Sequence, residues 1–241
     1  MTLGNDELFC RPVSLEASGD WVWKAAVAGE DKRFFHHPGV DPIALFRAAV
    51  QNVSSGRIVS GASTISTLVV KLTGERRPRN LLTKCIEAFR ALQMERITTK
   101  REIMEQYLNR APFGSNLIGI AAAARRYFGK EPRDLSLAEA ALLIGLPQSP
   151  ARLRPDRYPA PARERMVHIL ERMKGEGLIS EGEKQEALEQ PVSAGFHPLP
   201  RFAPHLCDLI VTRFPDEKTV RTFLEPDLQR MIEEVLRKDA G

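Results

Sequence analysis

AVAGEDKRFFHHPGVDP, residues 26–42, places two acids, two bases, two phenylalanines and two histidines in front of a break at proline and glycine. Surface helices disperse such residues, and protein cores exclude most of them. Val22, Ala25, Ala26 and Gly29 precede the acids at helical spacing. A carboxyl group at the edge of an apolar helix loses hydration, which raises its pKa and suits a general base. The stretch therefore predicts a helix ending in a candidate base, Glu30, while a helix-end ion pair with Lys32 or Arg33 is the plainer alternative.

The composition indicates a mostly helical chain with a sizeable core. Hydrophobic residues make up 43% of its 241 residues, enough for one large domain or a domain with a fragment. Leu, Ala, Glu and Arg predominate, and the alternation typical of strands is scarce. Three cysteines in no metal-ligand spacing supply neither a zinc site nor a disulfide framework. The net charge of +4 is a mild excess that suits an anionic partner but is common in ordinary proteins.

Helix starts and proline-rich segments divide the chain. Thr99, Ser136 and Ser180 are each followed three residues later by Glu, the capping-box pattern. A helix over 121–128 is expected to end at Gly129. Two proline-rich segments, 147–162 and 191–204, predict irregular structure. The expected organisation is an N-terminal segment (1–19), a main domain (20–190), a linker (191–204) and a fragment (205–241) with a short strand and one helix.

GASTISTLVVKL, residues 61–72, is a second candidate site. A core stripe at helical spacing comprises Ile65, Leu68, Val69 and Leu72, and another face carries Thr64, Thr67 and Lys71. The small residues before Thr64, among them Ser63, leave backbone N–H groups unobstructed, which suits an anion. An ordinary capped helix with a solvated lysine is the alternative.

LLTKCIEAFRALQMERI, residues 81–97, places Lys84 and Glu87 three residues apart on the face opposite an apolar one. By itself this pair predicts only a surface ion pair worth about 0.3 kcal/mol. His37, before Pro38, is more readily explained as a structural histidine than as a ligand. Phe34 and Phe35 are expected in the core.

In this order the motifs resemble the peptidoglycan glycosyltransferase domain (glycosyltransferase family 51) of bifunctional, class A penicillin-binding proteins, closest to their 1C subgroup. The family's first motif, E-D-x-x-F-x-x-H-x-G, is matched in full by Glu30, Asp31, Phe34, His37 and Gly39. Its other four motifs correspond to residues 61–71, 83–87, 107–130 and 135–150, and the resemblance covers about residues 20–190. Three positions depart from the family pattern: Thr67 and Leu68 replace glutamines, and Thr83 replaces an arginine.

The resemblance implies an all-α, lysozyme-like two-lobe domain that polymerises lipid II into glycan strands, with inversion and release of undecaprenyl pyrophosphate. Glu30 is then the catalytic base, and Lys71 and Lys84 hold the pyrophosphate. The further substrate-binding residues implied are Asp31, Arg57, Ser63 and Thr64. Glu87, the family's second essential acid, either orients a lysine or binds a divalent cation, Mg or Mn, beside the phosphates. No cofactor is required.

The implied partners are lipid II, the growing glycan strand, the membrane surface and a separate transpeptidase, and nucleic acid is not expected. Residues 41–57 mix large apolar residues with Arg47 and Arg57, which suits a membrane interface or, equally, a core helix. VRTFLEPDLQ, residues 220–229, resembles the beginning of a transpeptidase domain, yet no S-x-x-K or K-T-G follows it. We therefore expect a solo or truncated module.

The resemblance places this module at the extracytoplasmic, periplasmic face of the bacterial plasma membrane. No apolar run reaches the roughly 18–20 residues of a membrane span. The first ten residues lack the basic and apolar segments of a signal peptide. The chain as given is thus expected to carry neither an anchor nor a signal peptide.

Two other functions stay open. The first is a lytic transglycosylase or lysozyme-like hydrolase that cuts the same polymer. Lys71 and Lys84 argue against it, because cleavage of a sugar–sugar bond releases no pyrophosphate. The second is a catalytically impaired module that binds lipid II, since the side-chain amides of two motif glutamines are missing at Thr67 and Leu68.

Overall fold

The computed structural model describes residues 2–3, 9–56, 62–74, 78, 80–114, 116–195, 197, 204–215, 220 and 222–239. It separates into two compact units, Met1–His197 and Pro198–Gly241, which are described one at a time. In the described part of the chain no helix combines the length and the apolar character needed to cross a bilayer.

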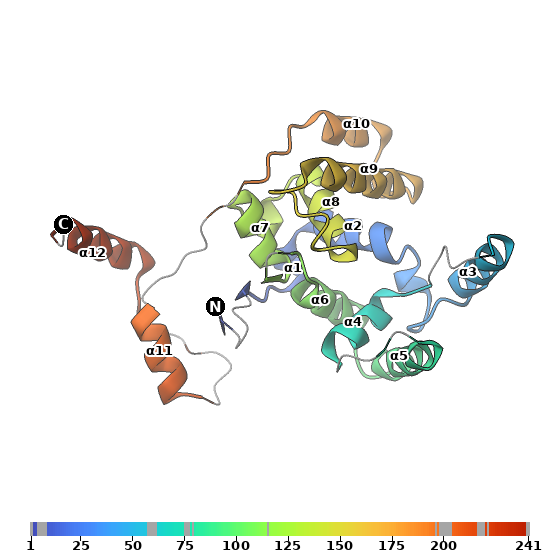
Figure 1. Ribbon diagram of the computed structural model, residues 1–241, viewed down its shortest axis with the longest axis horizontal. Coiled ribbons are helices and arrows are strands. Elements are labelled where there is room, and N and C mark those ends of the chain that lie inside the picture. The colour runs from blue at the N-terminus through green and yellow to red at the C-terminus, as the bar shows by residue number, and fades with distance from the viewer. Residues whose placement is uncertain are drawn as a thin grey trace. The chain divides into compact units, whose positions relative to one another are not determined.

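The first unit is built almost entirely of helices (Figure 1). Its α-helices are α1 (Leu15–Ser18), α2 (Asp20–Glu30), α3 (Pro42–Ser54), α4 (Ile65–Thr73), α5 (Leu81–Met94), α6 (Lys100–Arg110), α7 (Ile120–Phe128), α8 (Leu137–Gly145), α9 (Pro159–Gly175) and α10 (Glu181–Glu189). Three 3₁₀ turns are η1 (Phe34–His36), η2 (Pro132–Asp134) and η3 (Leu146–Gln148). Strands β1 (Thr2–Leu3), β2 (Phe9–Cys10) and β3 (Leu117–Ile118) form a small sheet in that order, antiparallel and then parallel.

The helix boundaries follow the predicted capping signals. Thr99, Ser136 and Ser180 each accept a hydrogen bond from the backbone N–H three residues on, and the glutamate there accepts one from the backbone N–H of the cap residue. These reciprocal bonds satisfy N–H groups that a helix start leaves without partners. α7 ends at Gly129, whose φ of 67° is the left-handed conformation that glycine adopts without strain.

One group of helices surrounds α8. Every residue of α8 is buried, and α2 and α9 pack against it. Gly29 in α2 faces α9, where an added Cβ would come within 2.8 Å of the Ile169 Cδ1 atom. Glycine therefore lets the two helices approach closely, and the next residue, Glu30, is brought to α9.

A second group consists of α4, α5 and α6, with α4 packed against the other two. The predicted stripe of α4 is partly confirmed, because Ile65 and Val69 are buried whereas Leu68 and Leu72 are half-buried. Figure 1 shows α3 and α5 at the end of the unit away from α10. The predicted fold class, an all-α two-lobe domain, is confirmed.

The segments on either side of the predicted main domain also belong to the first unit. Within 1–19, the Val13 N–H donates to Asn109 Oδ1 at 2.9 Å, and the Arg11 guanidinium bonds Glu131. Within 191–204, the N–H groups of Gly195 and His197 donate to carbonyls of α7, both at 2.9 Å.

The second unit contains α11 (Pro204–Arg213) and α12 (Pro226–Asp239). The sequence predicted a helix in this region and a short strand before it. The helix is present as α12, whereas α11 was not predicted, and residues 220 and 222–225 form no strand.

Candidate active site

A cavity of about 510 Å³ lies between the end of α2, one face of α3, the residues preceding α4, and α9. It brings together four of the predicted site residues: Glu30, Asp31, Ser63 and Thr64. Its far wall comes from α9, through His168 and Arg172, which the sequence analysis had not singled out.

Glu30 is the last residue of α2 and is half-buried. Burial raises the pKa of its carboxyl group, and the neighbouring charge of Asp31 adds to the rise. Arg165, Arg172 and the Tyr107 hydroxyl act in the opposite direction without cancelling it. The net shift has the direction expected of a general base, which must take up a proton near neutral pH.

Tyr107 of α6 faces Glu30 from inside the protein. Its side chain is 2% exposed, and its hydroxyl has no partner at hydrogen-bond distance among the described residues. Burial raises the pKa of this phenol well above its usual value, and the charge of Glu30 adds to the effect. Tyr107 is therefore a neutral donor, held where it can bond the carboxylate. Tyr107 is the first residue of the stretch 107–130 that matches a family motif, where nothing in the sequence indicated a role beside Glu30.

Two arginines of α9 complete the surroundings of Glu30. Arg172 Nη1 donates to the Gly29 carbonyl at 2.7 Å, next to Glu30 in the chain. Burial lowers the pKa of the Arg165 and Arg172 guanidinium groups, and the charge of Glu30 counteracts this. A sequence pattern could have indicated these two arginines. They stand seven residues apart, about two helical turns, on a helix whose buried positions include Met166, Ile169, Leu170 and Met173.

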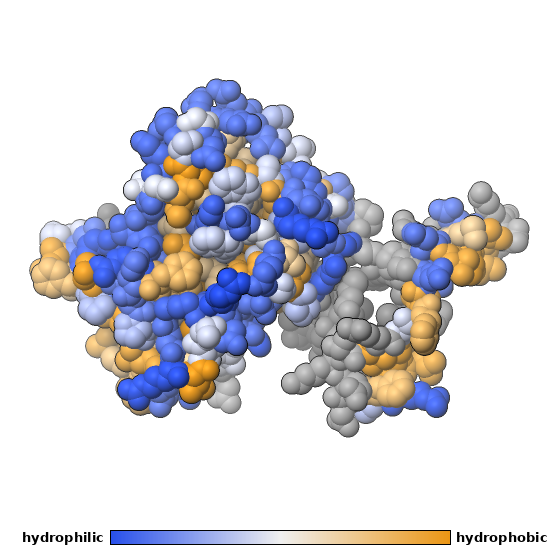
Figure 2. Space-filling view, turned by 180° about the vertical axis from the view of Figure 1, so that it is seen from behind, coloured by the Kyte–Doolittle hydropathy of each residue, from blue (hydrophilic) through white to orange (hydrophobic). Residues whose placement is uncertain are grey.

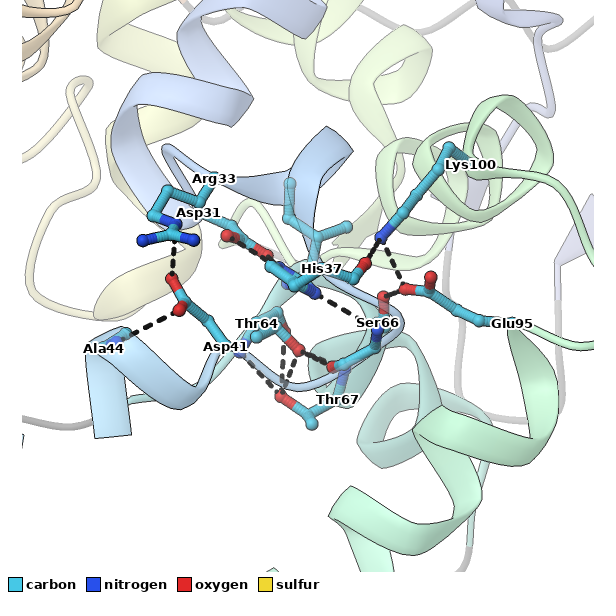
Figure 3. A network of polar contacts seen from close by, with 12 residues as sticks. Asp31, Arg33, His37, Asp41, Ala44, Thr64, Ser66, Thr67, Glu95 and Lys100 are labelled. Atoms are coloured by element: carbon cyan, nitrogen blue, oxygen red, sulfur yellow. Dashed lines mark hydrogen bonds and ion pairs between the residues drawn. The ribbon is translucent and has the colours of Figure 1, made fainter. Parts of the chain in front are cut away.

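Asp31 and His37 form a buried pair (Figure 3). The Gly39 N–H donates to His37 Nδ1 at 3.1 Å, so this nitrogen must be an acceptor and the proton lies on Nε2. Nε2 then donates to the Asp31 carboxylate at 3.0 Å. Asp31 Oδ2 also accepts from the Ile65 N–H at 3.0 Å. The expectation of a structural histidine is confirmed, whereas substrate binding by Asp31 stays a prediction for a carboxylate that already has internal partners.

Two threonines, Thr64 and Thr67, cap the N-terminus of α4 (Figure 3). Thr64 Oγ1 donates to the Gly39 carbonyl at 2.6 Å and accepts from the Thr67 N–H at 3.1 Å. Thr67 Oγ1 in turn accepts from the Thr64 N–H at 2.8 Å. Ser63 and Thr64 were both predicted to bind substrate. The single hydroxyl proton of Thr64 is engaged internally, whereas Ser63 is exposed, and substrate binding by either stays a prediction.

A network of charged and polar side chains adjoins His37 and the first turn of α4 (Figure 3). Lys100 Nζ donates to the His37 carbonyl and to Glu95 Oε1, both at 2.7 Å, and lies 4.4 Å from the centre of the Phe34 ring. The Ser66 hydroxyl donates to the same Glu95 oxygen. The network joins the loop after Glu30 to α4 and α6, so it fixes the scaffold of the site.

The predicted phosphate-binding residues lie elsewhere on the first unit. Lys71 is in the last turn of α4, and Lys84 and Glu87 are on α5; none of the three lines the cavity. Both lysines are exposed and form no ion pair with a described residue, so the expected surface pair of Lys84 with Glu87 is absent. Arg57 lies outside the described residues. No group of three or more His, Cys, Asp or Glu side chains within the described residues is arranged to hold a metal, and a cation at Glu87 stays a prediction.

The fold and the site define a helical enzyme domain whose cleft holds a carboxyl group, that of Glu30, with a pKa raised by burial and with arginines beside it. The chain belongs to the transglycosylase family, whose model matches residues 6–174, and the resemblance predicted from the motifs is confirmed.

Three relatives illustrate the match. Penicillin-binding protein 1C of Escherichia coli is 39% identical over 98% of this chain and 30% of its own length. Penicillin-binding protein 1A of Aquifex aeolicus is 41% identical over 82% of this chain and 27% of its own. A relative from Cupriavidus necator, named for transglycosylase activity, is 42% identical over 70% of this chain and 72% of its own.

Among solved structures, penicillin-binding protein 1A of Haemophilus influenzae aligns with a TM-score of 0.49 and 24% identity. The alignment covers 87% of this chain and 22% of that one. The chain covers about 30% of the length of penicillin-binding protein 1C, the first relative described above.

Proposed function

We propose that the first unit is a peptidoglycan glycosyltransferase that joins lipid II units into glycan strands, with inversion and release of undecaprenyl pyrophosphate. Family membership supports the reaction class. The observation that carries the proposal is Glu30, a single half-buried carboxyl group whose pKa is raised by burial. The arginines beside it come from a helix that the motifs did not include.

The leaving group explains why one carboxyl base suffices. A glycosidase expels a sugar alkoxide and needs an acid to protonate it, which usually requires two carboxyl groups. Here the 4-hydroxyl of the acceptor gives its proton to Glu30 while its oxygen bonds to the anomeric carbon of the donor. The bond from that carbon to the pyrophosphate oxygen breaks, and its electron pair leaves with the pyrophosphate, which needs no proton. The remaining requirement is positive charge near the phosphates.

Lys71 and Lys84 supply that charge in the proposed mechanism. Both are exposed and lack carboxylate partners among the described residues, so both are available to an anion. Glu87, half-buried on α5 with Lys84, would orient a lysine or hold a divalent cation against the phosphates. Polymerisation measured in EDTA and then with added Mg²⁺ or Mn²⁺ separates these two roles, because only the second requires the metal.

An apolar surface supports contact with a membrane, where a polyprenyl-linked substrate resides. On α3 it consists of Ile43, Phe46, Val50 and Val53, and on α5 of Leu81, Leu82 and Phe89. Phe46 is 72% exposed and Val53 is 83% exposed, so α3 is not the core helix that the sequence also allowed. Figure 2 shows apolar patches among polar ones on the side that carries α3 and α5. We propose that this surface lies against the extracytoplasmic face of the plasma membrane, with a transpeptidase as a further partner.

One experiment distinguishes the proposal from its rivals. The purified chain is incubated separately with lipid II in detergent micelles and with insoluble peptidoglycan. Glycan strands and undecaprenyl pyrophosphate from lipid II support the transferase. Soluble fragments from peptidoglycan without polymer indicate the lytic transglycosylase or lysozyme-like hydrolase. Binding of lipid II with no product from either substrate indicates an impaired binding module.

A further inference from the structure

More charged side chains line the cavity than a single catalytic base requires. Several of its charged groups are satisfied internally. Asp31 bonds His37 and Ile65, and the Lys32 ammonium pairs with Glu176 at 2.9 Å.

Asp41, on the same cavity wall, is satisfied as well. It accepts from the N–H groups of Ile43 and Ala44 at the start of α3, and it lies 3.5 Å from the Arg33 guanidinium. Once these pairs are set aside, Glu30, Arg47 and Arg172 remain to face the open space.

Arg47 and Arg172 line the same cavity from two different helices. Ala44, Arg47 and Gln51 share the inward face of α3, and Arg172 projects from α9. The positive charge of Arg47 contributes to the lowered pKa of Arg172, after burial and against the opposite influence of Glu30 and Glu176. Arg172 bonds a backbone carbonyl, and neither arginine forms an ion pair with a described residue. Two positive charges that line one cavity without ion-pair partners in the described part of the chain suit an anionic ligand.

The residues that line the cavity indicate which kind of anion it would bind. The volume of about 510 Å³ is in the range of small-molecule sites and exceeds the needs of an isolated anion, so the charged group belongs to a larger moiety. No Phe, Tyr or Trp side chain is among the described lining residues, which leaves a sugar ring without the large stacking surface that these side chains provide. Gln51 and the Lys32–Glu176 pair offer instead the mixed polar groups that suit a peptide. The pyrophosphate is already assigned to Lys71 and Lys84, outside this cavity.

We propose that Arg47 and Arg172 bind a carboxylate of the peptide stem carried by the lipid-linked substrate. This inference rests on the proposed function, since it deepens the description of the same site. It assigns the cavity wall formed by α3 and α9 to stem recognition, and it gives α3 two roles. The inward face of α3 binds the peptide, and the neighbouring apolar face of the same helix contacts the membrane.

A binding experiment tests the inference without turnover. Calorimetric titration of the full chain uses three probes: a synthetic stem pentapeptide with free carboxylates, the same peptide with its carboxyl groups amidated, and inorganic pyrophosphate. The variants are Arg47→Ala and Arg47→Glu. The control is Arg110→Ala, which removes an exposed helix arginine that donates a hydrogen bond to Gln106 of the same helix.

We expect the free-carboxylate peptide to bind the wild type and the control alike. We expect Arg47→Ala to weaken its binding by about tenfold or more, as loss of a charge-assisted hydrogen bond predicts, and Arg47→Glu to weaken it further. The amidated peptide should bind no better to the wild type than the free peptide binds to Arg47→Ala. Undetectable binding to the wild type, unchanged affinity in Arg47→Glu, or an Arg47 dependence found only with pyrophosphate would each overturn the proposal.

A kinetic comparison separates this inference from the proposed function. Polymerisation is measured with lipid II and with its analogue whose stem is truncated to two residues. Stem recognition predicts that Arg47→Ala raises KM for the full-length stem and leaves KM for the truncated stem unchanged. If the wild type forms no polymer but the peptide binds in an Arg47-dependent way, the function fails and the site stands. If polymer forms with equal KM values in all variants, the function stands and the site fails.

Discussion

The Asp31 carboxylate accepts a hydrogen bond from the backbone N–H of Ile65 at 3.0 Å, although 34 residues separate them in the chain. The bond satisfies one of the N–H groups at the start of α4, where a negative charge is also favoured by the helix dipole. It fixes the residue after the proposed base to the helix that carries Lys71. Asp31 is therefore one of the residues that fix the position of the base relative to α4.

Asp31→Asn should destabilise the first unit and impair activity beyond the loss of folded protein. His37 and Ile65 both donate to Asp31, and an amide presents one of them with a second donor. A buried donor without a partner costs about 1–3 kcal/mol. We expect a lower melting temperature by circular dichroism and a lower kcat at temperatures where the variant is folded. Asp134→Asn, at an exposed acid of η2, is the control, and equal melting of both variants would show that the bond is not important.

Glu30→Gln should abolish polymerisation and raise stability at neutral pH. The folded-state pKa of Glu30 is raised by burial, so the folded protein binds a proton more readily than the unfolded chain. Its contribution to stability is therefore fully present below the unfolded pKa of about 4.3 and is lost as pH rises through the folded pKa. Each unit of difference corresponds to about 1.4 kcal/mol. Gln avoids the cost of a buried charge at neutral pH.

Thermal melts across pH test this linkage. The advantage of Glu30→Gln over the wild type should be greatest near pH 7 and should disappear as the pH falls through the raised pKa. The matched control is Glu164→Gln at an exposed position of α9. A constant advantage at all pH values would mean that packing, not charge, separates the variants. Retained polymerisation by Glu30→Gln would refute the assignment of the base.

Local signals in the sequence were sufficient for much of the fold. The capping boxes at Thr99, Ser136 and Ser180 act through backbone groups only three residues away, so the residue types determine the geometry. The burial of Phe34 and Phe35 could not be predicted from their local sequence. Both were expected in the core, yet Phe34 is fully buried and Phe35 is 51% exposed. Which of two adjacent side chains points inward depends on a turn that only the packed structure defines.

The site was predictable where its residues are consecutive and was missed where they converge from distant segments. Glu30 was identified from the apolar helix before it. Arg172 was not, because its proximity to Glu30 depends on the close packing of α2 and α9 at Gly29, a contact between segments more than a hundred residues apart. Tyr107 was missed for a similar reason, since an apolar position on a helix does not reveal that its hydroxyl faces a carboxylate.

Arg165→Gln should move the acid limb of the pH–rate profile to higher pH. Arg165 is the largest influence that lowers the pKa of Glu30, so its removal raises that pKa further. The base must be ionised to accept a proton, and activity is then lost at a higher pH as the medium is acidified. The measurement is kcat/KM against pH with lipid II. Arg165→Lys, which keeps the charge, should retain the wild-type limb, and an equal shift in both variants would assign the effect to geometry.

Lys71→Ala and Lys84→Ala should each lower kcat while leaving the melting temperature near that of the wild type. Both side chains are exposed, so their loss removes little packing. A donor aimed at developing charge can be worth about 3–4 kcal/mol in the transition state, which is roughly 10²–10³ in rate. Lys174→Ala, at an exposed lysine of α9, should be nearly silent. Rates within a factor of about two of the wild type for both lysine variants would remove the phosphate site from α4 and α5.

Thr67→Gln combined with Leu68→Gln should strengthen binding of the lipid-linked donor without weakening α4. Thr67 occupies the third helical position and closes a capping box with Thr64. Glutamine is also a capping-box residue at that position, so the helix start is expected to persist. Leu68 is half-buried, and its replacement therefore loses only part of a core side chain. We expect a lower KM for lipid II and a melting temperature close to that of the wild type. Thr67→Val, which can neither cap nor hydrogen-bond a ligand, should lower the melting temperature without lowering KM. An unchanged KM in the double variant would show that these two positions do not contact the donor.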